Sequence, residues 1–285
     1  ITPYHITVED CISQDIVDEL ALSSDYDRRR AEIRAWNATS PILKRGIALT
    51  PVKFGISFTK TFLNQAGALV HVYTDGSIHL NHGGTEMGQG LFLKVAQVVA
   101  ETFQVDLARI KITATTTGKV PNTSATAASS GSDLNGMAAK NAAETIKLRL
   151  ISFLAKTHGV RAQEISFLPN RVHVRDRDIA FDDVVREAYM ARVPLSATGF
   201  YATPKIHWDR PAARGRPFFY FAYGAAVSEV AIDTLTGENR ILRTDILHDA
   251  GTSLNPAVDL GQIEGGYVQG AGWLTTEELI WDDKG

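Results

Sequence analysis

Residues 68–103 read ALVHVYTDGSIHLNHGGTEMGQGLFLKVAQVVAETF, and this stretch decides the fold class. Apolar and polar residues alternate over Ala68–Tyr73 and Ser77–Leu80, and Thr74-Asp75-Gly76 between them indicates a hairpin turn. A glycine-rich loop follows, and Leu91–Phe103 then shows the apolar spacing of an amphipathic helix. Because a hairpin pairs its strands antiparallel, we expect an α+β fold with mixed or antiparallel sheets and packed helices, and not a doubly wound parallel sheet.

The order hairpin, loop and helix occurs twice in the chain. It runs first from Gly67 to Phe103, where Gly88-Gln89-Gly90 opens the helix, and again from Ala225 to Leu279, where Gly261-Gln262 does. The shared order favours an internal duplication, with coincidence as an equal alternative. The other periodic segments predict helices at 17–37, 133–156, 181–191 and 260–279, strands at 47–59, 110–114, 165–168 and 171–174, and a hairpin of 218–233 and 240–247.

Composition limits the classes of function. Of 285 residues, 44% are hydrophobic and 21% charged, so the chain can bury a core and is not intrinsically disordered. The net charge of −3 argues against nucleic acid as a partner, and no apolar run approaches the ~18 residues of a membrane span. Cys11 is the single cysteine, which fits a reducing, cytoplasmic location. The histidines form no His-x-x-x-His pair, so we expect no metal ligands.

Two loops have the chemistry of an anion site. In Gly83–Gly90, four glycines allow close backbone approach, and the N–H groups at the start of the next helix would face a ligand. In Thr123–Ser132, small residues and hydroxyls precede a long amphipathic helix, an arrangement that cradles phosphate without a cation. The alternatives are a tight strand-to-helix turn for the first loop and a flexible linker for the second.

Two further segments give weaker signals. Residues 261–270 combine four glycines with Gln262, which predicts close packing or close approach of a ligand near a helix start. In residues 53–59, Phe54 and Phe58 are four apart, so in a strand they would share one face. Such a pair usually belongs to the core, and the alternative is that it clamps a flat ligand.

Together, these segments resemble the molybdenum-cofactor-binding subunit or domain of the xanthine oxidase family of molybdenum hydroxylases. The motifs occur in family order and are KFGISFTKTFLNQAGALVHVYTDGS (53–77), GGTEMGQG (83–90), VPNTSATAAS (120–129), DLNG (133–136), SEVAIDTLTG (228–237) and GQIEGGYVQG (261–270). Each motif alone is weak, whereas the set is highly specific.

The resemblance implies which residues hold a molybdenum–molybdopterin cofactor. Gly88 and Gln89 would contact it mainly through the backbone, and Gln262 would hydrogen-bond the pterin. The molybdenum and terminal phosphate region would be lined by Thr126, Ala127, Ala128, Ser129, Ser130 and Gly131. The family often has a hydroxyl residue where this chain has Gly131, so only the N–H group would remain there.

The resemblance also implies a purine substrate. Phe54 and Phe58 would sandwich the ring, Thr59 would lie near it, and Ala127 and Ala128 would lie beside the metal and the substrate. The Phe-Gly-Ile-Ser-Phe segment resembles xanthine dehydrogenases more than aldehyde oxidases, since two aromatic walls favour a planar purine by ~0.5–1.5 kcal/mol each beyond area burial. We therefore expect oxidation of hypoxanthine and xanthine to urate by hydroxylation at a purine carbon.

Two parts of the family pattern do not occur in this sequence. The catalytic glutamate, in a Gly-Glu-Pro-Pro-like segment, is expected beyond Gly285, and the upstream cofactor loops would precede Ile1. We therefore expect an internal fragment with no catalytic residue of its own and no turnover in isolation. Residues 1–40 would be a helical segment that continues a missing cofactor-binding half, and residues 41–285 a cofactor-binding domain truncated at its C-terminus.

The family implies partners as well. Electrons would leave through 2Fe-2S and FAD groups on other domains or subunits, and we expect an oligomer. An aldehyde oxidase-type or carbon monoxide dehydrogenase-type hydroxylase is the alternative within the same class. A second class is a binding or structural module that folds without cofactor and associates through its exposed faces.

Overall fold

The structure is a computed structural model that describes residues 1–285. The chain forms two compact units: Ile1–Gly55 with Tyr220–Gly285, and Ile56–Phe219. The sequence alone placed a boundary at residue 40, whereas these units divide at 55/56 and 219/220. That boundary concerned the domains of a longer protein, and it stays a prediction.

The unit Ile56–Phe219 is built on a four-stranded sheet. Its strand order is β4 (Ile110–Ile112), β3 (Ile78–His82), β2 (Gln65–Val72) and β8 (Ser196–Ala202). β2 pairs antiparallel with both of its neighbours, and β3 pairs parallel with β4, so the sheet is mixed as expected. The hairpin of β2 and β3 is the one predicted from the alternating pattern.

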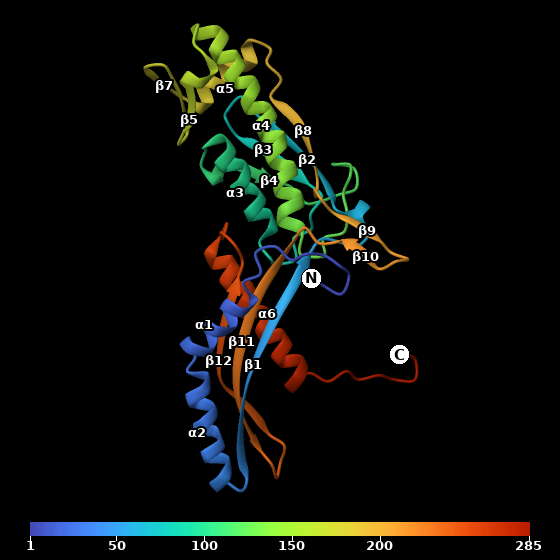
Figure 1. Ribbon diagram of the computed structural model, residues 1–285. Helices are drawn as coiled ribbons and strands as arrows, with labels where there is room; N and C mark the ends of the chain where they lie inside the picture. The colour runs from blue at the N-terminus through green and yellow to red at the C-terminus, as the bar shows by residue number, and fades with distance from the viewer. The chain divides into compact units, whose positions relative to one another are not determined.

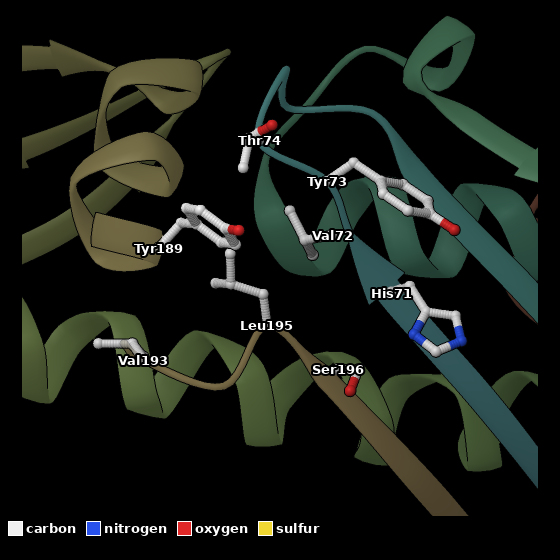
Figure 2. Close-up of a pocket in the computed structure, with 8 residues that line it drawn as sticks. All are labelled: His71, Val72, Tyr73, Thr74, Tyr189, Val193, Leu195 and Ser196. Atoms are coloured by element: carbon white, nitrogen blue, oxygen red, sulfur yellow. The ribbon is translucent and has the colours of Figure 1, made fainter. Parts of the chain in front are cut away.

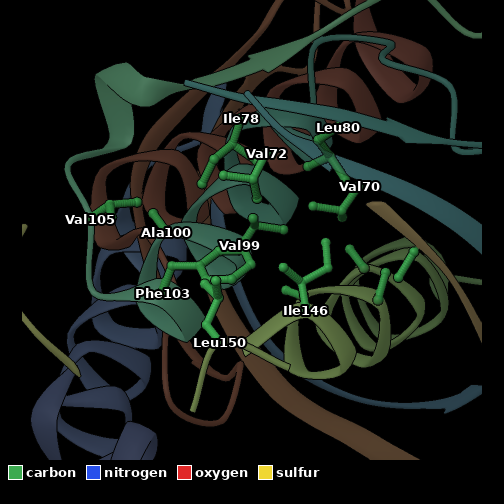
Figure 3. Close-up of a cluster of buried hydrophobic side chains, with 14 of the residues drawn as sticks. Val70, Val72, Ile78, Leu80, Val99, Ala100, Phe103, Val105, Ile146 and Leu150 are labelled. Atoms are coloured by element: carbon green, nitrogen blue, oxygen red, sulfur yellow. The ribbon is translucent and has the colours of Figure 1, made fainter. Parts of the chain in front are cut away.

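Two helices cover one face of this sheet, α3 (Leu91–Phe103) and α4 (Gly131–His158). Every second residue of β2 points to the helices and is buried, from Ala66 to Val72. Figure 3 shows Val70 and Val72 in one cluster with Phe103 of α3 and with Ile146 and Leu150 of α4. A Cβ at Gly199 would overlap the Ala138 carbonyl, so α4 and β8 approach backbone to backbone. The predicted apolar stripe of α4 is therefore core.

Smaller elements complete this unit. A second antiparallel sheet joins β5 (Ile165–Leu168), β6 (Arg171–Val174) and β7 (Arg177–Ala180), followed by α5 (Phe181–Met190). A short hairpin pairs β9 (His207–Asp209) with β10 (Arg214–Arg216). Single 3-10 turns lie at Thr61–Leu63, Leu107–Arg109 and Ala162–Glu164.

The other unit is a three-stranded sheet with helices. The strand order is β1 (Leu43–Ile56), β11 (Tyr220–Asp233) and β12 (Asn239–Asp249). Its core consists of Ile16, Leu20, Tyr223, Ala225 and Val227. The helices are α1 (Ser13–Ser23), α2 (Tyr26–Thr39) and α6 (Pro256–Thr275), labelled in Figure 1. No helix of the chain is long and apolar enough to cross a bilayer.

Three sequence-based boundaries were wrong. The helix predicted at 17–37 is two helices, because Asp25 adopts a left-handed φ of 56° between them. The extended segment predicted to reach Thr59 ends at Ile56, because Ser57 has a φ of 126°. The last helix begins at Pro256 with Asn255 as its N-cap, so Gly261-Gln262 lies inside the helix and does not open it.

Candidate functional site

Two loops of the unit Ile56–Phe219 dock on each other. The first, Gly83–Gly90, connects β3 to α3, and the second, Thr123–Ser130, leads into α4. The Thr85 N–H donates to Thr126 Oγ1 at 2.9 Å. A Cβ at Gly83 would overlap the Thr123 side chain, so only glycine lets the loops come this close.

An open cavity of about 340 Å³ lies where the two loops meet. Its wall contains six residues that the resemblance had assigned to the cofactor: Gln89, Thr126, Ala127, Ala128, Ser129 and Gly131. Three further residues that were not predicted from the sequence also line it: Met87, Leu91 and Ser132. Gly88 directly precedes Gln89 in the chain, and Ser130 is buried, with its hydroxyl donating to the Ala127 carbonyl at 3.2 Å. The fold therefore gathers residues from both loops at one place.

The second loop has an unusual backbone. Ala128 and Ser129 adopt φ values of 56° and 54°, and Ser130 follows at −101°. Positive φ is uncommon outside glycine, and successive left- and right-handed residues turn their N–H groups to one side. The start of α4 adds its positive dipole end, with Ser130 as an N-cap that makes no side-chain capping bond. This backbone fits a phosphate or another anionic group.

The first loop differs from the expectation. The start of α3 was predicted to offer N–H groups to a ligand, but the chain's own Glu86 carboxylate accepts from them. Oε1 accepts from the Gly88 and Gly90 N–H groups at 3.0 Å each, and Oε2 accepts from Phe92 at 2.9 Å. Desolvation raises the pKa of this carboxyl, but the backbone hydrogen bonds outweigh it and leave the pKa below its ordinary value. The start of α3 is therefore already supplied with an anion.

Gln89 braces the same loop. Its Oε1 accepts from the Met87 N–H at 2.6 Å, and its Nε2 donates to the Thr85 carbonyl at 2.8 Å. With the side chain used within the loop, contact through the Gln89 backbone remains the prediction for a ligand. The two glycines beside it, Gly88 and Gly90, have φ values of 99° and 75°, which a side chain would strain.

His82, at the end of β3, is a buried residue that holds the first loop by a hydrogen bond. It is 3% exposed, its Nδ1 accepts from the Gly84 N–H at 3.1 Å, and its ring lies edge-on to Phe92. Since Nδ1 is an acceptor, the ring is neutral with its proton on Nε2, which is buried without a partner. Burial lowers the pKa of His82 to about 4, and the nearby Glu86 opposes this. The sequence analysis did not single out this histidine.

The remaining predicted site residues lie elsewhere. Phe54 is half exposed and belongs to the unit with β1, whereas Phe58 and Thr59 belong to the unit Ile56–Phe219. Phe54 and Phe58 do not share one strand face, as had been predicted, because the strand ends between them. Asn64 holds the Phe58 backbone by two hydrogen bonds, from Phe58 N–H at 2.7 Å and to its carbonyl at 2.9 Å. The clamp stays a prediction.

Gln262 lies on α6, in the unit that contains β11 and β12. The Tyr267 hydroxyl ties this helix to the sheet, 3.0 Å from Ser228 Oγ and 2.7 Å from Thr244 Oγ1. Gln262 precedes Tyr267 by five residues, which at 100° per residue places it about 140° around the helix. Gln262 is therefore on the side of α6 away from Ser228 and Thr244, and the residue is exposed.

A second cavity carries none of the predicted residues. It measures about 460 Å³ and is lined by His71–Thr74 of the hairpin, Tyr189 of α5 and Val193, Leu195 and Ser196 before and in β8 (Figure 2). Its wall contains no Asp, Glu, Lys or Arg. The chain also holds no group of three or more His, Cys, Asp or Glu that could bind a metal ion. The cavity between the loops is thus the candidate site, and its residues offer hydrogen bonds instead of metal ligands.

This combination defines a class: an α+β binding domain with a cavity between two helix-opening loops, of which the loop before α4 has a backbone that suits an anionic ligand. The sequence model of the Molybdopterin cofactor-binding domain matches residues 19–285, and the chain belongs to that family. It is 48% identical over 268 residues to Xanthine dehydrogenase/oxidase of Mus musculus, covering 94% of this chain and 19% of that protein. It is 45% identical over 280 residues to Xanthine dehydrogenase of Oryza sativa subsp. japonica, covering 98% of this chain and 19% of that protein.

A solved structure shares the fold. Quinoline 2-oxidoreductase from Pseudomonas putida 86 matches with a TM-score of 0.78 at 23% identity, over 98% of this chain and 36% of that one. The comparisons confirm both the α+β fold class and the resemblance to the xanthine oxidase family. The chain spans about a fifth of the length of its curated relatives, 19% of each of the two above.

Proposed function

We propose that this chain forms part of a molybdenum hydroxylase that oxidises hypoxanthine and xanthine, and that it holds part of the molybdenum–molybdopterin cofactor. The observation that carries the proposal is the cavity between Gly83–Gly90 and Thr123–Ser130, with its backbone donors at the start of α4. The relatives named xanthine dehydrogenase support the reaction. When bound, the molybdenum cofactor supplies the two-electron redox chemistry of hydroxylation.

The residues of the second loop suit this task. The N–H groups of Ser129 and of the first turn of α4 bind the cofactor's phosphate, because left-handed residues followed by a right-handed one favour a concave run of N–H groups. Ala127 and Ala128 carry only methyl groups, so they leave room for metal and substrate at the wall of the cavity. Gly88 and Gln89 contribute backbone, and Gln262 of α6 contributes its amide to the pterin.

The purine remains the proposed substrate. Phe54 and Phe58 flank it and Thr59 lies near it, as the resemblance implies. No carboxylate of these 285 residues lies in the family's glutamate motif, so the chain alone is proposed to bind without turnover. The 2Fe-2S and FAD groups are proposed for other domains or subunits. An aldehyde oxidase-type hydroxylase is the second candidate within the class.

A single substitution tests the cofactor site. Ser132 lies in the first turn of α4 and lines the cavity. In Ser132→Asp, the added carboxylate interacts with the positive end of the α4 dipole and stabilises the folded chain by about 0.3–1 kcal/mol. The same carboxylate repels a phosphate bound there. We expect the cofactor-free protein to unfold at the same or a higher temperature, while the complete enzyme loses most of its molybdenum.

The neutral variant Ser132→Asn is the matched control, and it should retain molybdenum. Molybdenum is measured by elemental analysis of the purified protein. If Ser132→Asp holds as much molybdenum as Ser132→Asn, the phosphate is not at the start of α4. If the unsubstituted enzyme contains none, the cofactor-free structural module is the correct reading.

A further inference from the structure

The starts of two helices meet at the candidate site, but only one of them is open to a ligand. At α4, residues of the preceding loop line the cavity, and two of them, Ala128 and Ser129, have positive φ values. At α3, the corresponding groups of Gly88, Gly90 and Phe92 donate to the carboxylate of Glu86. The two helix starts therefore differ: a carboxylate of the chain fills the one at α3, and none caps the one at α4.

We propose that Glu86 is a positioning residue that fills the start of α3 with the chain's own negative charge and so directs the anionic group of the cofactor to the start of α4. The inference rests on the proposed function, because it concerns how that cofactor is oriented. Glu86 itself does not line the cavity, whereas its neighbours Met87 and Gln89 do. It acts through the loop it holds.

The position of Glu86 separates this role from ordinary helix capping. A capping side chain belongs at the N-cap, which is Gly90, or three residues into the helix. Gly90 has a φ of 75°, so Asp or Ser there would be strained. Glu86 lies four residues before Gly90 and reaches forward across the turn to Gly90 and Phe92. The shape that presents Met87 and Gln89 to the cavity thus requires a carboxylate supplied from inside the loop.

The hydrogen bonds show why the carboxylate also excludes a second anion. Three backbone donors converge on its two oxygens at 2.9–3.0 Å, and hydrogen bonds to an ionised acceptor are about twice as strong as neutral ones. A phosphate at the start of α3 would have to displace Glu86 or lie beside a like charge. At the start of α4, Ser130 makes no side-chain capping bond, and Asp133, the acidic residue of the first turn, does not line the cavity.

Chemical rescue tests the proposal in the complete enzyme. Glu86→Ala removes the carboxylate and leaves a gap that formate or acetate can enter, because Glu86 is exposed at the surface of the chain. We expect purified Glu86→Ala to hold about tenfold less molybdenum and pterin than the unsubstituted enzyme, by analogy with other supporting residues around metal sites. Purification in sodium formate should restore most of the loss, and sodium chloride at the same ionic strength should not.

Two controls give the experiment its discrimination. Glu86→Gln fills the same space but places an amide donor against backbone donors, so it should lose cofactor and gain nothing from formate. Glu101→Ala removes an exposed carboxylate near the other end of α3 and should match the unsubstituted enzyme. The proposal is overturned if Glu86→Ala keeps its cofactor like Glu101→Ala, or if formate restores Glu86→Gln as well as Glu86→Ala.

A second readout is independent of cofactor loading. The cofactor-free Glu86→Ala protein should melt at a lower temperature than the cofactor-free unsubstituted protein, and formate should raise its melting temperature selectively. If the unsubstituted enzyme contained no molybdenum, the proposed function would fail. The melting test would still show whether the Glu86 carboxylate stabilises the start of α3. If it contains molybdenum but formate moves neither readout of Glu86→Ala, only the inference about Glu86 fails.

Discussion

Protonation of His82 should lower the stability of this chain as the pH falls through the mildly acidic range. The pKa of His82 is about 4 in the folded chain, against an ordinary value of 6.5. Because the folded value is the lower one, the unfolded chain takes up a proton at a pH where the folded chain does not. The stabilisation is thus complete above about pH 6.5 and is lost as the pH falls toward 4.

The magnitude follows from this difference. The two pKa values, 6.5 and about 4, differ by 2.5, and at 1.36 kcal/mol for each whole pKa unit this amounts to about 3 kcal/mol at most. At about pH 5 the unfolded state is almost fully protonated and the folded state is hardly so, which leaves a loss of about 2 kcal/mol relative to about pH 7.5. Glu86 stays ionised over this range, because its pKa is below its ordinary value.

Urea unfolding of the 285-residue chain at the two pH values measures the effect. His82→Asn is the comparison, since its Oδ1 can accept from the Gly84 N–H group but the amide does not titrate. We expect the free energy of unfolding of the unsubstituted chain to fall by about 2 kcal/mol more than that of His82→Asn on acidification. Other titrating groups, such as His79, are present in both chains and cancel. An equal fall in the two chains would refute the assignment of His82 as a buried neutral base.

Two other predictions concern the ion pairs of α2 and the choice of substrate. The Arg29 side chain is 6% exposed and forms ion pairs with Glu229 and Asp245 at 2.8 Å each. Arg29→Ala leaves both carboxylates without this partner, so it should lower the free energy of unfolding by about 3–5 kcal/mol in urea titrations. A decrease no larger than the one caused by replacing an exposed arginine with alanine would contradict this prediction. In the complete enzyme, Phe54→Ala and Phe58→Ala should reduce kcat/KM for xanthine far more than for an aldehyde. Equal losses for both substrates would favour the aldehyde oxidase-type alternative.

The local sequence pattern was enough to predict helices, because a helix forms its hydrogen bonds within its own segment. Leu91–Phe103 was predicted with its observed ends, because the apolar spacing and the glycines before it act within a few residues. β8 was missed, because Ser196–Ala202 has no clear alternation and is a strand only through its pairing with β2. The break at Asp25 was missed for a related reason: a single left-handed residue leaves the helical pattern on both sides intact.

The two loops of the site could be predicted from the sequence, but the hydrogen bonds that decide which helix start is open could not. Small residues and glycines identify Gly83–Gly90 and Thr123–Ser132, and the structure joins them at one cavity. The sequence could not show that Glu86 had already taken the donors of α3, since an acidic residue in a polar loop is indistinguishable from a solvated charge. An acidic residue shortly before a helix that starts after glycine is the one signal that could have indicated this role.

The repeated Gly-Gln motif shows why similar sequence does not imply a similar role. Gln89 precedes α3, and both ends of its amide are used to brace the loop, so only its backbone is left for a ligand. Gln262 lies well inside α6, because Asn255 and Pro256 start that helix earlier than the motif. It is consequently on a regular helix face, opposite the side that Tyr267 ties to β11 and β12. If the two halves do descend from one ancestral unit, moving the helix start has converted a loop brace into a residue on an exposed face of a helix.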